Sequence, residues 1–531
     1  MYRVNEVAVS LEDNLDKENL YNVLANFFHV RKQDIKNFTI VKKSLDARKK
    51  SNIHYKYNFD VEFDKNVEKI VVNKFNLQKV EKEIYVTPKI EKQKRVVVVG
   101  SGPSGLFAAL ELVKSNVKVV LLERGECIED RVKTVEELLK TGKLNKESNI
   151  QFGEGGAGTF SDGKLNTGIN SPLVNQVLRT FYENGAEENV LYDNKAHIGT
   201  DQLRSVVKNI RNNIIKLGGE VKFKTKFVDF KTDKDKVEVI YENCGAQGKI
   251  IADDLILALG YSARDTHRVM NKKGLEYMQK PFSVGYRIEH LQEDINKAQY
   301  GENYNKLLPP ADYKLFAHLE NKRTVYTFCM CPGGEVVPAI SGDNQIVTNG
   351  MSYHARDGKN ANSAILVSVD EKDYKSSDAL AGLKFQEQLE RNAYKEGNGK
   401  FIVSRVEDFM NNKETVKLTK VNPTIKPYYS LGNVYKLLPK ELSESIKQGL
   451  VILGKKLKGF DDKDAILTGI ETRSSAPFMV KRNESLSTSI NHVYSVGEGA
   501  GMAGGIVSSA VDGLKVARKI IENYLKEEKW S

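Results

Sequence analysis

The sequence predicts an α/β protein whose parallel-sheet domain is interrupted by a long β-rich insertion. The apolar strand Arg95–Val99 runs directly into the glycine-rich turn Gly100–Gly105, and a helical segment follows it. A similar strand, glycine loop and helix return only after Thr488. A continuous apolar strand is typical of a parallel sheet that is covered on both faces. We therefore expect the chain to leave this domain and to return to it much later.

This pattern divides the chain into four segments. Residues 1–90 are expected to form an N-terminal α+β module, and residues 91–269 the first part of a dinucleotide-binding domain. Residues 270–475, with scattered strands and turns rich in Pro and Gly, are expected to form a substrate or cap domain. Residues 476–531 would complete the dinucleotide-binding domain.

Composition excludes several classes of protein. The chain has 531 residues, of which 40% are apolar and 28% are charged, as in an ordinary soluble globular protein. Its apolar runs are far shorter than the ~18 residues needed to span a membrane, and no secretory signal precedes Asp13. Four cysteines are too few for a disulfide scaffold and lack zinc-site spacing. We expect a cytoplasmic protein without a membrane span or a metal site.

The N-terminal module shows alternating strand and helix patterns. Strands are expected at Arg3–Leu11, Phe38–Val41 and His54–Phe63, and helices around Leu20–Phe28 and Asn66–Phe75. This β-α-β-β-α order resembles a ferredoxin-like unit. The formal net charge is +11, and the basic run Lys42–Lys50 lies between two of these strands. That run is expected to be either a solvated hairpin connection or a docking place for a polyanion such as RNA.

The remaining elements of the dinucleotide-binding domain follow from periodicity. The sequence predicts helices and strands, in order, at Leu106–Lys114 (helix), Val117–Leu122 (strand), Asp201–Leu217 (helix), Glu220–Phe230, Val237–Tyr241 and Ala252–Gly260 (strands), and Ile506–Asn523 (helix).

The turn Gly100-Ser101-Gly102-Pro103-Ser104-Gly105 has the spacing of a dinucleotide-binding motif. Gly100 permits a tight turn, Gly102 lets the backbone approach a pyrophosphate, and Gly105 lets the helix pack on the strand. The helix N-terminus offers N–H groups to the phosphates. Glu123, followed by Arg124, comes 21 positions after Gly102, where a carboxylate accepts hydrogen bonds from ribose and repels a 2′-phosphate. The nucleotide is therefore expected to be FAD or NAD rather than NADP.

The segment Thr488–Glu498 resembles the second fingerprint of flavoproteins, whose acidic residue binds the ribityl chain. Glu498, after Gly497, stands where that pattern usually has Asp. Met502, Ala503 and Gly504 would approach the flavin ring, and Ile506 begins the last helix. The resemblance implies FAD in an interrupted, glutathione-reductase-like domain. A dehydrogenase that binds only NAD would leave this motif unexplained.

Further motifs resemble the FAD-dependent dehydrogenase (NAD-utilizing dehydrogenase) family of bacterial flavoproteins. More distantly, they resemble aminoacetone-oxidase-like and geranylgeranyl-reductase-like flavoproteins. The motifs are Phe152–Leu165, Leu257–Thr266, Phe328–Val337 and Glu471–Pro477. The resemblance covers essentially the whole chain and implies a fold and a cofactor, but no settled substrate.

The first of these motifs contains Gly155, Gly156 and Gly158, followed by Thr159. Its successive N–H groups could form an anion-binding nest at the pyrophosphate or flavin. Lys164 could place a charge near the flavin ring or be solvated. Gly260 resembles the turn that passes the adenine side of FAD, where Phe227 bounds the adenine or belongs to the core.

Candidate reactive groups lie in the inserted segment and just after it. Cys329 and Cys331 are expected to be a redox pair, thiols beside the flavin, or buried small residues. Of the two, substitution of Cys331 is expected to have the larger effect. His354 is a candidate acid or base, or a surface histidine. Arg473 could hold a carboxylate or phosphate, or simply pair with Glu471.

The sequence therefore predicts an FAD-dependent oxidoreductase that transfers a hydride between flavin N5 and an organic small molecule. The alternatives are a flavin-dependent reductase of a nucleobase in RNA, a flavin-containing binding or sensing protein, and a different electron partner such as O2 or quinone. The chain contains no second strand-linked glycine motif, so NAD(P)H would dock only transiently on the flavin. The oligomeric state is not predicted.

Overall fold

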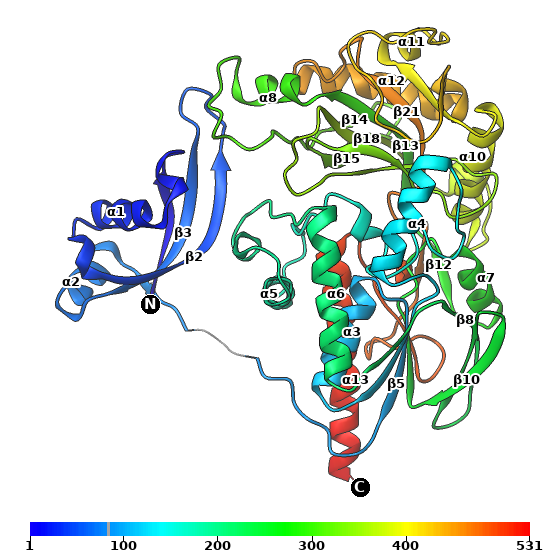
Figure 1. Cartoon of the computed structure of the whole chain (residues 1–531), viewed down its shortest axis with the longest axis horizontal. Helices are drawn as coiled ribbons and strands as arrows, with labels where there is room; N and C mark the ends of the chain where they lie inside the picture. Colours follow the sequence, from blue (N-terminus) through cyan, green and yellow to red (C-terminus); the bar gives the residue numbers. More distant parts are fainter. Residues whose placement is uncertain (82–84, 531) are drawn as a thin grey trace.

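The computed structural model describes residues 1–81 and 85–530, and it contains a five-stranded parallel sheet in its lower part as drawn in Figure 1. Its strand order is β23-β11-β5-β6-β7. These strands are β5 (Arg95–Val99), β6 (Lys118–Leu122), β7 (Glu220–Lys222), β11 (Asp254–Leu257) and β23 (Val493–Ser495). Since β11 pairs in parallel with both β5 and β23, segments nearly 400 residues apart share one sheet. The prediction of an interrupted α/β fold is confirmed.

Successive side chains of β5 point to opposite faces of the sheet, as in any pleated strand, and are buried in two different layers. Val96 and Val98 pack with the helices on one face, and Val97 and Val99 pack with an antiparallel meander on the other. The helical layer consists of α3 (Pro103–Lys114), α5 (Leu173–Glu183), α6 (Thr200–Lys216) and α13 (Ile506–Trp530). The meander consists of β8 (Thr225–Thr232), β9 (Val237–Asn243) and β10 (Ala246–Ala252). Two further helices in this part of the chain are α4 (Ile128–Thr141) and α7 (Arg264–Lys272).

The inserted segment folds around one seven-stranded sheet, where the sequence predicted only scattered strands. Its order is β14-β15-β18-β13-β21-β19-β20, and only β19 and β20 among its neighbours are parallel. The strands are β13 (Phe282–Leu291), β14 (Phe316–His318), β15 (Thr324–Cys331), β18 (Asn360–Val369), β19 (Phe401–Arg405), β20 (Tyr429–Leu431) and β21 (Ile466–Glu471). The helix α12 (Lys440–Lys456) packs across four of these strands.

Shorter elements complete this part of the chain. Its other helices are α8 (Gln292–Tyr300), α9 (Glu371–Tyr374), α10 (Ala381–Glu396) and α11 (Val406–Met410). Two-stranded ladders join β12 (Tyr277–Gln279) to β22 (Phe478–Val480) and β16 (Glu335–Pro338) to β17 (Thr348–Met351). Single 3₁₀ turns occur through the chain at Asp13–Leu15, Lys32–Asp34, Ala157–Phe160, Glu188–Leu191, Val434–Leu437 and Glu498–Ala500.

The N-terminal module has a four-stranded sheet in the order β2-β3-β1-β4, with antiparallel neighbours. Its elements are β1 (Tyr2–Val9), α1 (Lys17–Phe28), β2 (Ile35–Asp46), β3 (His54–Phe63), α2 (Lys65–Phe75) and β4 (Gln78–Lys79). This is the strand order of a ferredoxin-like unit. Among the described residues of the whole chain, no helix has both the length and the apolar character needed to cross a membrane.

The basic run Lys42–Lys50 differs from its prediction, because β2 continues to Asp46 and takes up half of it. Three of its five cations have protein partners. The Lys43 ammonium lies over the Tyr55 ring, Arg48 pairs with Asp46, and Lys50 Nζ donates to the carbonyl of Ala298. RNA binding by this run stays a prediction, with fewer charges available for it than the sequence suggests.

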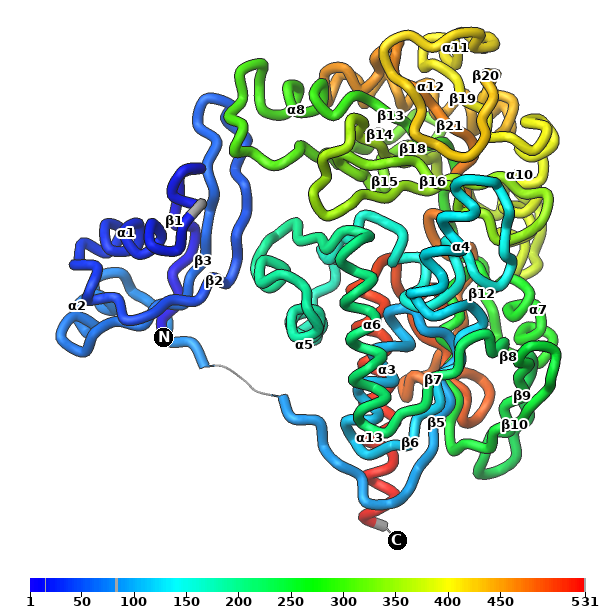
Figure 2. Tube along the Cα trace, in the orientation of Figure 1, coloured from blue at the N-terminus to red at the C-terminus, as the bar shows by residue number. Residues whose placement is uncertain are grey.

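The module is joined to the rest of the chain by backbone pairing at the edge of β2. Lys43 N donates to Tyr192 O at 2.8 Å, and Asn194 N donates to Lys43 O at 2.8 Å. The segment 192–194 therefore forms an isolated parallel bridge with the edge of this sheet. The hairpin of β2 and β3 also reaches the region of α8 (Figure 2).

Candidate functional site

A cavity of about 510 Å³ joins the glycine turn after β5 to strand β15 of the inserted sheet. Its wall contains most of the site residues that the sequence predicts. These are Gly100, Gly102, Pro103, Ser104, Glu123, Arg124, Gly156, Gly158, Lys164, Phe227, Gly260, Cys329, Arg473, Glu498, Gly504 and Ile506. The remaining predicted residues lie outside this wall: Ser101, Gly105, Gly155, Thr159, Cys331, His354, Gly497, Met502 and Ala503.

The glycine turn is built as its spacing predicts. A side chain at Gly100, whose φ is +102°, would lie 2.3 Å from the carbonyl oxygen of Ala258. One at Gly105 would lie 1.9 Å from the carbonyl oxygen of Gly100. At Gly102 the nearest atom is the Gly156 Cα, 3.8 Å away, so the space beside this residue is open. The turn is therefore closely packed at Gly100 and Gly105, and it is open at Gly102, which lines the cavity.

Glu123 connects this turn to the following glycine loop. Its Oε2 accepts hydrogen bonds from Ser101 N (2.9 Å) and Ser101 Oγ (2.8 Å). Its Oε1 accepts from Gly125 N (2.9 Å) and Gly153 N (3.1 Å). Four donors fill the acceptor sites of this carboxylate. A bond from Glu123 to a ribose hydroxyl therefore requires that one of these protein bonds be exchanged.

The loop from Asn149 to Gly156 is held by a buried guanidinium that the sequence analysis missed. Arg131, on α4, is fully buried. Its Nε donates to Asn149 O (2.9 Å), Nη2 to Ile150 O (3.0 Å), and Nη1 to the carbonyls of Gly153 (3.2 Å), Glu154 (2.6 Å) and Gly156 (2.9 Å). The pattern of α4 gives no signal of this role, because the acceptors are backbone atoms of another segment.

Three N–H groups of the predicted anion-binding nest already have partners within the protein. Gly153 N donates to Glu123, Gly155 N to Ser101 O, and Gly156 N to Gly153 O. These three groups hold the loop together, and a nest in the rest of the loop stays a prediction. Gly158 reaches the cavity at the end of the loop, where a side chain would lie 2.9 Å from Ile506 of α13.

Strand β15 has a bulge where it meets the cavity. The pairing with β18 shifts between Phe328 and Cys331, and Cys329 has a φ of +44°, in the left-handed region. A bulge turns side chains away from the regular alternation of a strand. Cys329 lines the cavity, whereas Cys331 is fully buried and its Sγ lies 3.3 Å from the Cys329 carbonyl oxygen.

The two thiols have opposite pKa directions. A hydrogen bond from the Cys331 thiol lowers the pKa of Cys329, and the nearby Lys164 and Arg287 lower it further. The same hydrogen bond raises the pKa of Cys331, and burial adds to this. Arg287 is itself buried, bonded to both oxygens of Glu471 at 2.7 Å and to Cys329 O at 2.9 Å. Of the two thiols, Cys329 is the one that lines the cavity, and the expected ranking of the two substitutions stays a prediction.

The other two reactive candidates are held by protein partners. His354 is not part of the cavity wall; its Nδ1 is 2.9 Å from Ile198 O, its Nε2 is 3.2 Å from Glu187 Oε1, and its ring stacks on His197. Arg473 lines the cavity but pairs with Glu390, through Nε at 3.0 Å and Nη2 at 2.9 Å, and not with Glu471. Arg264 binds the same Glu390 carboxylate with two bonds of 2.8 Å.

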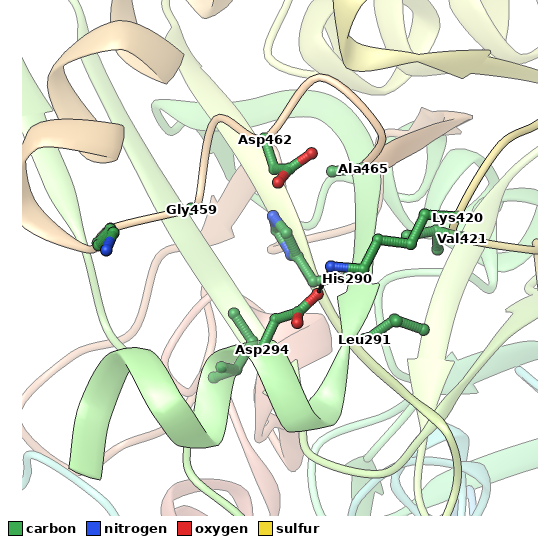
Figure 3. Close-up of a pocket in the computed structure, with 10 residues that line it drawn as sticks. His290, Leu291, Asp294, Lys420, Val421, Gly459, Asp462 and Ala465 are labelled. Carbon is green, nitrogen blue, oxygen red and sulfur yellow. Dashed lines mark hydrogen bonds and ion pairs between the residues drawn. The ribbon is translucent and has the colours of Figure 1, made fainter. Parts of the chain in front are cut away.

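A second cavity lies in the inserted part, where His290, Asp294, Lys420 and Asp462 surround it (Figure 3). Its volume is about 30 Å³, the space of roughly one water molecule. Lys420 and Asp294 already form an ion pair of 2.6 Å there. Within the described part of the chain, no three side chains of His, Cys, Asp or Glu gather as metal ligands. The larger cavity is the candidate site.

Family models match three parts of the chain. Residues 94–295 match the model described as pyridine nucleotide-disulphide oxidoreductase, and residues 281–474 match FAD-dependent protein, C-terminal domain-like. Residues 1–62 match a domain of unknown function. An uncharacterized protein of Clostridium beijerinckii is 45% identical over 534 residues, which cover 98% of this chain and 99% of that protein. The chain belongs to a family of FAD-dependent oxidoreductases.

Solved structures of flavoproteins are similar to this one at low sequence identity. A mutant of the halogenase PltM in complex with FAD has a TM-score of 0.40 and 11% identity, over 82% of this chain and 71% of that one. A geranylgeranyl bacteriochlorophyll reductase-like protein of Thermoplasma acidophilum has a TM-score of 0.36 and 12% identity, over 82% and 83% of the chains. A flavoprotein/dehydrogenase of Cytophaga hutchinsonii has a TM-score of 0.32 and 12% identity, over 83% and 80%.

FAD is the cofactor of this flavoprotein, and the cavity has features that fit it. The glycine turn opens onto the cavity at the N-terminus of α3, as a pyrophosphate requires. No atom lies within 4 Å of a side chain placed at Gly504 or at Gly260, both of which line the cavity. The glycines thus leave open space at both fingerprints and at the turn after β11.

His267 supports the turn after β11, at Gly260, and its burial leads to a prediction about pH dependence. It is buried, with Nε2 2.9 Å from Gly260 O and Nδ1 2.9 Å from the Tyr277 hydroxyl. Burial lowers its pKa to about 4. Its stabilising contribution is therefore complete above its unfolded pKa of about 6.5 and is lost as the pH falls toward 4. We expect protonation of His267 to lower the free energy of unfolding by about 2 kcal/mol when the pH falls from 7.5 to 5.

Urea unfolding at these two pH values checks this expectation against His267→Gln, which cannot take up the proton. The variant should be less stable at pH 7.5 and should lose less stability on acidification. An equal loss in both proteins would contradict the assignment.

Proposed function

We propose that this flavoprotein transfers a hydride between its flavin and a small organic substrate bound beside strand β15. The observation that carries the proposal is one continuous cavity, which connects the glycine turn to the bulge of β15. Bound FAD supplies the hydride chemistry through its N5 atom. The chain supplies the positions of both reactants and the charges around them.

The proposed cofactor contacts follow the two fingerprints. Gly100–Gly105 and the N-terminus of α3 would hold the pyrophosphate, and Phe227 and Gly260 would bound the adenine end. Glu498 and Gly504, before α13, would contact the ribityl chain and the flavin. Burial raises the pKa of Glu498 to about 7. A carboxyl with this pKa can either donate or accept a hydrogen bond near neutral pH.

The proposed reactive groups come from the bulge of β15. Cys329 faces the cavity with a lowered pKa, and a thiolate is the reactive form of cysteine. Cys331 would act through it by donating a hydrogen bond. Arg473, which uses four of its five N–H donors on Glu390, Ser341 and Gln345, would mainly shape the wall of the cavity.

The choice of electron partner also belongs to this proposal. We propose that NAD(P)H, if it is the donor, docks transiently at the flavin, because the chain has one strand-linked glycine motif of this type. O2 or a quinone is the alternative electron partner of the flavin. All four cysteines are free, which supports a reducing, cytoplasmic location. Neither nucleobase reduction in RNA nor a sensing role has a structural observation in its favour.

Anaerobic reduction of the bound flavin tests the proposal. We expect NADH or NADPH to bleach the flavin absorbance of the wild-type protein. Cys329→Ser should retain FAD but slow flavin reduction or reoxidation by about tenfold, with a smaller effect for Cys331→Ser. Cys244→Ser is the control, because this cysteine is exposed on the meander. Wild-type rates in both β15 variants would reduce this segment to a packing role.

A further inference from the structure

One end of the cavity, beside strand β15, is rich in charged side chains. We call it the outer end, and it lies between the loop that follows Asp162, the segment Asp312–Lys314, and β15. Its charged lining residues are four cations and two carboxylates: Lys164, Lys195, Lys314, Arg356, Asp162 and Asp312. With four positive and two negative side chains, the formal charge of this end is positive. A positively charged pocket concentrates anions.

One carboxylate organises the innermost of these charges. Asp162 is fully buried, and its Oδ1 accepts from Arg356 Nε at 2.9 Å. Its Oδ2 accepts from Arg356 Nη2 at 2.5 Å and from Lys164 Nζ at 2.5 Å. Because two cations share one oxygen atom, their charged ends lie next to each other. This cluster of three groups carries one net positive charge.

Donor capacity remains in this cluster after the internal bonds are counted. Arg356 uses Nε and Nη2 on Asp162, and within the described chain its Nη1 makes no hydrogen bond. Lys164 uses two of its three donors, on Asp162 and on the carbonyl oxygen of Met330. Both residues line the cavity. Adjacent donors from a guanidinium and an ammonium can bind the two oxygens of a carboxylate.

We propose that the outer end binds the carboxylate group of an organic acid, through Arg356 and Lys164, and so selects a carboxylate-bearing substrate. This inference rests on the proposed function, since it names the class of substrate for the same cavity. The single net charge of the cluster matches a monoanion better than a doubly charged phosphate. Phe328 and Met330, on the same wall, offer contact to the apolar body of such an acid.

The other cations of the outer end have different surroundings. Lys195 is already paired with Asp312 at 2.6 Å, across the rim of the cavity. Lys314 is exposed, and the charge of Lys164 also interacts with the thiols of Cys331 and Cys329. Arg356 is therefore the residue whose free donors lie deepest, and the test is built on it.

Equilibrium binding of simple probes to the FAD-loaded, full-length protein tests the proposal. Benzoate and its neutral isostere benzamide are titrated by calorimetry, and perturbation of the flavin spectrum is recorded in parallel. We expect benzoate to bind at least tenfold more tightly than benzamide, because only benzoate carries the negative charge. Arg356→Gln should weaken benzoate binding at least tenfold, leave benzamide unchanged and retain FAD.

The control is Arg391→Gln, which removes an equal charge from the exposed surface of α10 and should not change benzoate binding. Equal affinity for benzoate and benzamide in the wild-type protein overturns the proposal without reference to any variant. Inorganic phosphate binding more tightly than benzoate also overturns the choice of a carboxylate. If no nicotinamide nucleotide or organic substrate reduced the flavin, the proposed function would be contradicted. The affinities for benzoate and benzamide would still test the carboxylate site.

Discussion

Gly102→Val protein is expected to fold and to purify without FAD. Gly102 has a φ of −73° and an extended ψ, a conformation that valine adopts easily. The nearest atom to its new Cβ lies 3.8 Å away, so the protein itself accommodates the side chain. The valine would occupy the space at the N-terminus of α3 where the pyrophosphate belongs. The ratio of flavin to protein absorbance measures the loss, and chromatography of the cofactor released from wild-type protein should identify FAD and not FMN.

Gly168→Val is the matched control for this variant. Gly168 is exposed, and a side chain placed there meets no atom within 4 Å. It should retain full FAD, and both variants should show wild-type unfolding midpoints after the cofactor is removed. Full occupancy in Gly102→Val would show that the pyrophosphate lies elsewhere.

Arg131→Met is expected to lose both stability and bound FAD. The substitution leaves up to five buried carbonyls of the loop from Asn149 to Gly156 without their donor. Unpaired buried acceptors are costly, and we expect the free energy of unfolding to fall by at least about 3 kcal/mol. The loop that faces the cofactor would then lose its shape. Urea unfolding measures the first effect, and retention of FAD through dialysis measures the second.

Arg131→Lys separates charge from geometry, because lysine keeps the charge but cannot reach carbonyls spread across the guanidinium fork. It should fold better than Arg131→Met and still release FAD faster than the wild type. Arg391→Met, on the exposed surface, is the control for the loss of an arginine. If Arg131→Lys held FAD as tightly as the wild type, the geometry of the guanidinium would be irrelevant to the loop.

The parts of the fold that the sequence predicts best depend on local patterns. The bounds of β5 agree with the apolar run Arg95–Val99, and the glycine turn after it has the expected packing. The N-terminus of α3 was placed three residues late, at Leu106 rather than Pro103, because the helix begins inside the motif. Spacing within one turn or one strand is a property that neighbouring residues alone determine.

The parts that could not be predicted depend on pairs of residues far apart in the chain. Arg287 and Glu471 lie 184 positions apart, and Arg356 and Asp162 lie 194 positions apart. No periodicity joins such partners. The order of the strands in the seven-stranded sheet is a non-local property of the same kind. Which of Cys329 and Cys331 lines the cavity could not be predicted either, because it depends on a bulge that is set by pairing with β18.

The pairing of β2 with the segment 192–194 has a consequence for the synthesis of the chain. β2 is an edge strand of its sheet, and its outer backbone groups at Lys43 bond to Tyr192 and Asn194. Roughly 150 residues must leave the ribosome after β2 before this partner exists, which takes on the order of 10–30 seconds. During that interval an unpaired edge could add a strand from another nascent chain. The exposed Lys36 and Lys42 on β2 place charge along this edge, and such charge keeps a newly made strand from joining the wrong partner.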